Sequence, residues 1–245
     1  MHKNWEGMPI VIFGSGGISR ETLNIIEDIN RYNNFPVYNF LGFIEDDSSK
    51  IGINKNGYRI ISSDQEFEIF ATNFKILAVV IPLGTPKIKQ KIYDNISFME
   101  NLIYPNIIHP TVNLRESIKL GFGNIITAGV RMTTEITIGN FNLLNLNCTV
   151  GHDVIIKDYC VINPLASISG NVLIENNVLI GTGANVLQNI KVHSNSIVGA
   201  GAVAVKDVEE NSTVFGIPAS VFRLKWGKEM DKILVIGFGT MGMGI

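Results

Sequence analysis

The sequence lacks most of the features that mark secreted, membrane-spanning and nucleic-acid-binding proteins. Its 245 residues include two cysteines, Cys148 and Cys160, so a disulfide scaffold is not expected, and no Cys/His cluster has the spacing of metal ligands. No apolar run approaches the roughly 18 residues of a membrane span, and residues 1–7 contain no apolar core of a signal peptide. A net charge of −2 gives no basic excess for nucleic acid. We therefore expect a cytoplasmic protein with no metal, no nucleic-acid partner and no membrane insertion.

What the sequence does contain is a strict repeat. Every sixth residue from Leu114 to Val198 is Leu, Ile, Met or Val, fifteen positions in succession. A period of six matches neither a helix nor a lone strand, and it is typical of a hexapeptide β-helix. Three hexapeptides make one triangular coil of 18 residues, so we predict about five stacked coils with three parallel sheets.

A second inward-facing column precedes this ladder by two residues, because residues i and i+2 lie on the same face of a strand. Its members are small or apolar, including both cysteines, with polar exceptions at Asn124 and Asn142. These two asparagines are 18 residues apart, so we predict that they stack and hydrogen-bond to each other as an amide ladder.

The period of 18 also aligns residues on the outside of the coil. It places His152, Gly170, Gln188 and Lys206 in one column, each about 4.8 Å above the last. A histidine beside Asp153 is suited to general-base chemistry near neutral pH. A glycine above it offers a free backbone N–H to an oxyanion, and a distant lysine could meet a phosphate. This order of groups suits a long phosphorylated carrier such as coenzyme A, although a β-helix that merely displays a surface is the alternative.

The N-terminal part predicts a small α/β unit. Apolar strands at 10–13, 38–44 and 76–81 alternate with helices at about 19–29 and 86–96, which indicates a parallel sheet. The first strand runs into a Gly14-Ser15-Gly16-Gly17 turn, which can hold a ligand at the start of a helix. A redox dinucleotide fingerprint would need glycine at Ser19, so NAD is not expected there.

We predict three segments: a Rossmann-like domain at 1–105, a β-helix domain at 106–222 and a tail at 223–245. The tail contains a strand at 232–236 followed by Gly237-x-Gly239-x-x-Gly242, which resembles the start of a hydroxyacyl-CoA dehydrogenase-type domain. The second strand and the acidic residue about 20 positions further on are missing. We interpret the tail as the truncated beginning of a fused domain or of an adjacent reading frame. We predict no NAD binding, although an NAD-linked oxidoreductase is the function it would indicate.

Several segments together resemble the sugar acetyltransferases of the NeuD/PglD type, over roughly residues 9–222. In the N-terminal part and at the junction they are 12–17 (IFGSGG), 42–47 (GFIEDD) and 106–110 (NIIHP). In the repeat they are 151–153 (GHD), 168–172 (ISGNV), 180–184 (IGTGA), 198–203 (VGAGAV), 206–208 (KDV) and 216–219 (GIPA).

The resemblance implies a left-handed parallel β-helix, an acetyl-CoA-dependent sugar acetyltransferase and a homotrimer with the donor between subunits. It implies that His152 deprotonates the amine or hydroxyl of the acceptor and that Asp153 orients the imidazole. For the donor it implies contacts from Gly170, Thr182, Ala200 and Lys206. For the nucleotide sugar or sialic-acid-like sugar it implies contacts from Gly16, Gly17, Ile18, Glu45, Asp46, Asp47, Gly84 and Thr85.

One position departs from the family pattern. Some members carry a second histidine nine residues after the base, where it contacts the acetyl donor; here that position is Val161. We expect that contact to be lost or to be replaced by Asn163. A non-catalytic trimeric module that binds a nucleotide sugar is the alternative to an enzyme.

Overall fold

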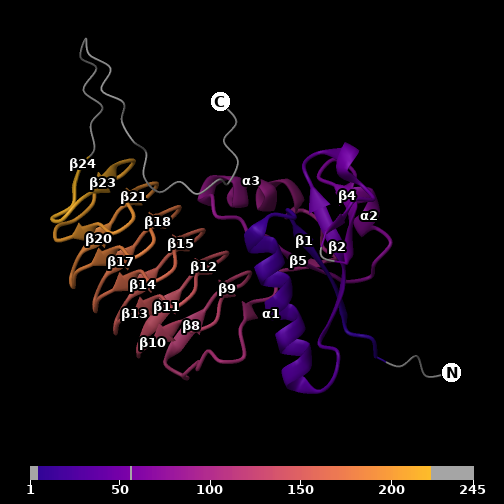
Figure 1. The fold of residues 1–245 in the computed structure, drawn as a ribbon, viewed down its shortest axis with the longest axis horizontal. Coiled ribbons are helices and arrows are strands. Elements are labelled where there is room, and N and C mark those ends of the chain that lie inside the picture. The colour runs from indigo at the N-terminus through magenta and orange to yellow at the C-terminus, as the bar shows by residue number, and fades with distance from the viewer. Residues whose placement is uncertain (1–4, 56, 222–245) are drawn as a thin grey trace, which may run out of the picture.

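The computed structural model describes residues 5–55 and 57–221, so His2 and the glycine-rich tail predicted at 223–245 lie outside the described residues. Figure 1 shows two parts side by side, an α/β unit and a β-helix whose coils stack away from it. No helix among the described residues has the length and apolar character that crossing a membrane requires.

The α/β unit has a six-stranded sheet in the order β3-β4-β2-β1-β5-β6. The pairs β1–β2, β1–β5, β2–β4 and β5–β6 are parallel, as predicted, and only β3 runs antiparallel to its neighbour. Its elements are β1 (Met8–Phe13), α1 (Gly17–Asn33), β2 (Tyr38–Glu45), the 3-10 turn η1 (Ser48–Lys50), β3 (Asn54–Lys55), β4 (Tyr58–Ser63), α2 (Phe67–Ala71), β5 (Leu77–Val80), α3 (Pro86–Ile96) and β6 (Leu102–Ile103).

Helices cover both faces of this sheet. Leu23 and Ile26 of α1 pack with Ile12 on one face, while Phe67 of α2 and Ile96 of α3 pack on the other. The sequence did not predict β4, because its Tyr-Arg-Ile-Ile-Ser-Ser run has neither a long apolar stretch nor strict alternation. The carboxyl end of β4 was therefore not expected, although it lies at the edge where parallel sheets bind ligands.

The hexapeptide segment forms the predicted left-handed parallel β-helix with three sheets. Sheet I contains β10 (Arg131–Met132), β13 (Thr149–Val150), β16 (Ser167–Ile168), β19 (Asn185–Val186) and β22 (Val203–Ala204). Sheet II contains β8 (Ile118–Leu120), β11 (Ile136–Ile138), β14 (Ile155–Ile156), β17 (Leu173–Ile174) and β20 (Lys191–Val192). Sheet III contains β7 (Ile107–Ile108), β9 (Ile125–Ile126), β12 (Leu143–Leu144), β15 (Val161–Ile162), β18 (Leu179–Ile180), β21 (Ile197–Val198), β23 (Thr213–Phe215) and β24 (Ser220–Val221).

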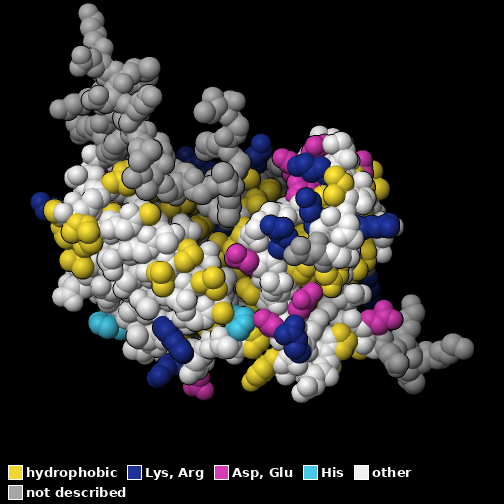
Figure 2. All heavy atoms as spheres, in the orientation of Figure 1, with side chains coloured by type: hydrophobic (Ala, Val, Ile, Leu, Met, Phe, Trp, Pro, Cys, Tyr) yellow, Lys and Arg dark blue, Asp and Glu magenta, His cyan; other side chains and the backbone are white. Residues whose placement is uncertain are grey.

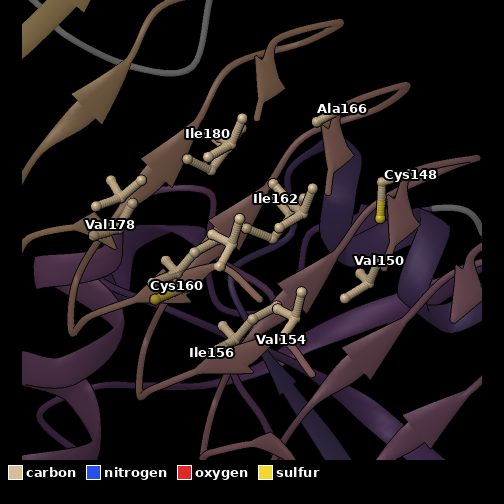
Figure 3. Packing of buried hydrophobic residues seen from close by; sticks show 14 of the residues in the cluster. Cys148, Val150, Val154, Ile156, Cys160, Ile162, Ala166, Val178 and Ile180 are labelled. Atoms are coloured by element: carbon tan, nitrogen blue, oxygen red, sulfur yellow. The ribbon is translucent and has the colours of Figure 1, made fainter. Parts of the chain in front are cut away.

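The interior of the coil contains both predicted columns. Figure 3 shows Cys148, Val150, Cys160 and Ile162 among the side chains that meet inside it, and all four are at most 1% exposed. Leu114, the first rung of the predicted ladder, is the exception at 41% exposed. It lies in an irregular segment before β8, so the repeat enters the coil after it.

The predicted amide ladder is confirmed and is longer than expected. Asn142 Nδ2 donates to Asn124 Oδ1 at 3.1 Å, and Asn124 Nδ2 donates to Asn106 Oδ1 at 3.1 Å. Asn142 Oδ1 in turn accepts the N–H of Cys160 at 2.8 Å. Each buried amide is therefore paired by the coil next to it, which removes the penalty of an unsatisfied polar group.

The α/β unit covers sheet III. Outward-facing Ile125, Leu143 and Val161 share one buried cluster with Ile12 and Leu23 of the α/β unit. The side chain of Val161 is 0% exposed there, so the position of the family's second histidine is part of a packed interface in this chain.

A buried lysine connects α3 to the β-helix through a hydrogen bond. Lys89 is 1% exposed, and its Nζ donates to the carbonyl of Phe141 at 2.8 Å. Burial lowers the pKa of Lys89 to about 7 from 10.5. The unfolded chain then binds more protons than the native protein between these two values, so stability should fall as the pH decreases from about 10 to about 7.

Lys89→Met is therefore expected to raise the melting temperature by several degrees at pH 7, and the gain should shrink toward pH 10. Thermal unfolding of both proteins across this range measures the difference. Lys87→Met, an exposed lysine on the same helix, is the matched control and should change the melting temperature little at any pH. A pH-independent gain for Lys89→Met would contradict the assigned protonation.

Candidate functional site

His152 lies at the edge where sheet I turns into sheet II, between β13 and β14. Its Nδ1 is 2.7 Å from Asp153 Oδ2, and its side chain is 63% exposed. Asp153 has a left-handed backbone with φ of 59°, as have the matching turn positions of other hexapeptides, and an aspartate tolerates this conformation. With Nδ1 bonded to a carboxylate, the neutral imidazole presents an unprotonated Nε2 as a base.

Gly170 lies directly above the imidazole, as the 18-residue period predicts. Register pairs Thr149 with Ser167 and Val150 with Ile168, so the two turns that follow are stacked. A Cβ at Gly170 would lie 2.5 Å from His152 Nε2. Its N–H has no acceptor among the described residues, so the base lies beside a glycine whose backbone donor is free.

The predicted column does not extend unchanged to Lys206. Strands β19 and β22 keep the 18-residue offset, with Val186 beside Ala204, but Val192 pairs with Val208. The turn that contains Lys206 is therefore two residues shorter than the turn that contains Gln188. Lys206 lies on the same edge as His152 but in a different turn geometry, and it lines a cavity of about 280 Å³ with Val208.

Thr182 and Ala200 lie on a different edge from His152. They are in the turns from sheet III to sheet I, after β18 and β21, and both are exposed. Within one chain the structure therefore does not bring Thr182 and Ala200 together with His152 and Gly170.

The glycine-rich turn and the acidic run meet at the carboxyl end of the α/β sheet. Both the N–H and the Oγ of Ser15 donate to Glu45 Oε1, at 2.6 and 2.5 Å. Gly16 is the N-cap of α1 and has no side-chain cap, while Ile18 is buried in the core. The turn thus presents uncapped helix N–H groups beside a carboxylate, an arrangement that can bind both a phosphate and a hydroxyl or base N–H.

The three predicted acids have different surroundings. Glu45 and Asp46 both contact Lys50 Nζ, at 3.2 and 3.3 Å. Asp47 accepts the N–H of Ser49 at 2.9 Å, and hydrogen bonding from the side chain and the backbone of Ser49 lowers the pKa of Asp47. Asp47 therefore caps its own turn, while Glu45 and Asp46 remain the acids that face the glycine-rich turn or solvent.

Sequence reasoning missed Asp64 and Lys50 at this end of the sheet. Asp64 directly follows β4, and its N–H donates to the carbonyl of Glu45 at 2.9 Å. Burial, together with Asp46 and Glu45, raises the pKa of Asp64. Recognition of β4 as a parallel strand would have found Asp64, because residues after parallel strands gather at one edge.

Gly84 and Thr85 lie in the loop between β5 and α3, at the same carboxyl edge of the sheet, and Thr85 is the N-cap of α3. On the face of the molecule that Figure 2 draws, most charged side chains lie over the α/β unit and fewer lie over the β-helix. Among the described residues, no group of three or more His, Cys, Asp and Glu side chains could hold a metal ion.

The other two described histidines, His109 and His193, each lie beside a carboxylate. His109 Nε2 is 3.3 Å from Asp28 Oδ2 of α1, beside a cavity of about 330 Å³. His193 Nδ1 is 3.4 Å from Glu175 Oε2. Asn163 is bonded through its backbone to Ile180 and Ala166, and no described side-chain contact tests its predicted substitution for the missing histidine.

The N-terminal part of the chain matches one protein family, and most of the chain resembles several solved structures. Residues 9–96 match the model of the PglD N-terminal domain family. WeeI from Acinetobacter baumannii AYE is 26% identical with a TM-score of 0.77, over 88% of this chain and 100% of that one. The acetyltransferase domain of PglB from Neisseria gonorrhoeae FA1090 is 25% identical with a TM-score of 0.76 and the same coverage.

A third similar structure is perosamine N-acetyltransferase from Caulobacter crescentus, in complex with CoA and GDP-perosamine. It is 22% identical with a TM-score of 0.76, over 88% of this chain and 97% of that one. At this identity the likeness concerns the fold. No curated protein matches the sequence.

Proposed function

We propose that this chain, which belongs to the PglD/NeuD-type family of sugar acetyltransferases, transfers the acetyl group of acetyl-CoA to a nucleotide-activated amino sugar or a related sugar. The observation that carries the proposal is the His152–Asp153 pair with its Nε2 edge beside Gly170. The related perosamine enzyme binds CoA and a nucleotide sugar together, which is the substrate pair that the two parts of this chain suit.

In the proposed reaction His152 acts as the general base. Its Nε2 accepts the proton of the acceptor amine or hydroxyl, whose lone pair attacks the thioester carbonyl carbon. The Gly170 N–H stabilises the oxyanion of the tetrahedral intermediate. The carbon–sulfur bond then breaks, and the proton on His152 passes to the departing CoA thiolate. Asp153 holds the imidazole in one tautomer and stabilises its charged form.

The position of the α/β unit favours a site completed by a second copy. His152 lies on the edge between sheets I and II, whereas the α/β unit covers sheet III, the opposite face of the triangular coil. A sugar held at Gly16, Gly17 and Glu45 therefore faces a different side of its own coil from the base. A homotrimer that places the α/β unit of one subunit near His152 of the next would remove this separation.

Release of free CoA tests the proposal directly. The full chain is incubated with acetyl-CoA and each of a panel of UDP-, GDP- and dTDP-amino sugars and sialic acid. At least one acceptor should give thiol release at more than a hundredfold over the acceptor-free rate, and mass spectrometry should show a gain of one acetyl group. Absence of transfer to every class of acceptor would favour a non-catalytic binding module.

A further inference from the structure

A leucine lies in a strained and exposed turn position on the edge between sheets III and I. Five residues of this edge, 18 positions apart, have a left-handed backbone with φ between 58° and 77°: Gly129, Asn147, Leu165, Gly183 and Gly201. Glycine and asparagine adopt this backbone readily, whereas a leucine adopts it at a cost in free energy. Leu165 is also 62% exposed, so its own chain does not bury the side chain.

Two aromatic residues share the left-handed backbone, but both are packed. Phe141 and Tyr159 lie on the edge between sheets II and III, with φ of 54° and 61°. Their rings stack at 5.5 Å, and Tyr93 of α3 packs against both. Strain of this kind persists where surrounding contacts compensate for it. The packed apolar clusters of the described residues do not include Leu165, so a contact outside the single chain is the compensation we expect.

Leu165 lies at nearly the same height along the coil as the candidate base. It follows His152 by 13 positions, which corresponds to about 3.5 Å of rise at about 4.8 Å per coil. A second exposed leucine of the same edge, Leu146, precedes His152 by 6 positions and lies about 1.6 Å below it by the same spacing. Within one chain, sheet I separates these leucines from the base. They can therefore reach the base of another copy only.

Sheet I is the face on which a second copy fits. The α/β unit covers sheet III, and Lys89 of α3 is bonded to the edge between sheets II and III. The central outward residues of sheet I are small, and Thr149 Oγ1 donates to Ser167 Oγ at 3.1 Å. A second coil with a parallel axis can thus place its edge between sheets III and I against the His152 edge of the first. A contact between unlike edges repeats around a ring, as a homotrimer requires.

We infer that Leu165 of the partner subunit covers the His152–Asp153 pair, together with Leu146 of the partner subunit, and is a positioning residue for acetyl transfer. This inference rests on the proposed function and its homotrimer. In the single chain the side chains of His152 and Asp153 are 63% and 58% exposed. An apolar cover strengthens their hydrogen bond, because water no longer competes for the carboxylate. It also keeps water from the thioester carbonyl.

Cross-linking tests this placement without turnover. In a chain that carries His152→Cys and Leu165→Cys, a short bismaleimide should link neighbouring copies, and a denaturing gel should show covalent dimers and trimers. The thiols of Cys148 and Cys160 are buried, with both residues 0% exposed, and should not react. His152→Cys with Ile69→Cys is the matched control, because Ile69 is 74% exposed but lies on α2. It should give no linked product. Absence of covalent dimers from the first chain would overturn the inference.

Leu165→Gly removes the cover and retains the turn, because glycine has the same backbone at Gly183 one coil above. The kcat should fall by at least about tenfold, since an imidazole that is free to turn is aligned with the acceptor less often. The Kd for CoA should stay within about twofold, and hydrolysis of acetyl-CoA without acceptor should rise, because water reaches the carbonyl carbon. Leu165→Met keeps an apolar side chain and should preserve most of the kcat. A normal kcat for Leu165→Gly would overturn the positioning role.

Mixed assemblies test whether the base and its cover come from different chains. His152→Ala and Leu165→Gly chains are co-expressed, so roughly a quarter of the sites in a ring combine an intact His152 with an intact Leu165 from the neighbour. Activity should return to about that fraction of the unmodified rate. Activity no higher than the mean of the two variants would overturn the inference. Failure of the proposed function is a different result: the unmodified chain would transfer no acetyl group, while cross-linking would still decide where Leu165 lies.

Discussion

His152→Ala is expected to lower kcat for acetyl transfer by about 10²–10⁴-fold, the range typical of loss of a general base. The imidazole is exposed and contributes no packing to the coil interior, since its side chain is 63% exposed. Stability and binding of CoA should therefore change little. Steady-state release of CoA gives kcat, and calorimetry with CoA gives the binding constant.

His193→Ala is the matched control for this prediction. His193 is also partly exposed and also lies beside a carboxylate, Glu175, but it follows β20 on the edge between sheets II and III. Its replacement should leave kcat within about twofold of the unmodified rate. Full activity of His152→Ala would contradict the proposed mechanism for any acceptor sugar.

Gly170→Ala is expected to lower kcat/KM by about a hundredfold. The added methyl would lie 2.5 Å from His152 Nε2, so the imidazole must move away from the reacting atoms. A displacement of about 1 Å at a catalytic group typically causes a loss of this size. The measurement is acetyl transfer over a range of acetyl-CoA concentrations.

A double-mutant cycle separates this contact from a general effect on the coil. Gly170→Ala should lower the melting temperature in the unmodified chain and lower it much less in the His152→Ala background, where the ring is gone. Equal losses in both backgrounds would show that the methyl is opposed by backbone and not by the imidazole. The predicted stacking of the two residues would then be wrong.

The stacking of residues along the coil can be predicted from the sequence because a solenoid is periodic in space as well as in sequence. Once a coil takes 18 residues, the register of any two positions follows from subtraction. This is why the sequence alone predicts Gly170 over His152 and Asn142 over Asn124, and both placements are confirmed. The same subtraction failed at Lys206, where the last coil is shorter by two residues.

The α/β unit was less predictable because its ligand edge is assembled from separate strands. Glu45 and the glycine-rich turn were recognised from local patterns, and the structure joins them through Ser15. Asp64 joins the same edge only because β4 pairs beside β2. No fixed sequence spacing relates such strands, since their order in a sheet depends on side-chain packing between layers.

The sequence by itself determined the coil, its interior and the pairing of a candidate base with a glycine, because each of these depends on a repeat along one chain. Only the tertiary structure decided which sheet the α/β unit covers and which edges of the coil remain open. Those outcomes depend on contacts between distant segments, such as Lys89 with Phe141 and Val161 with the α1 side of the sheet. They also depend on side-chain caps such as Asp158 on Asn140, whose partners are visible only when the coils are stacked.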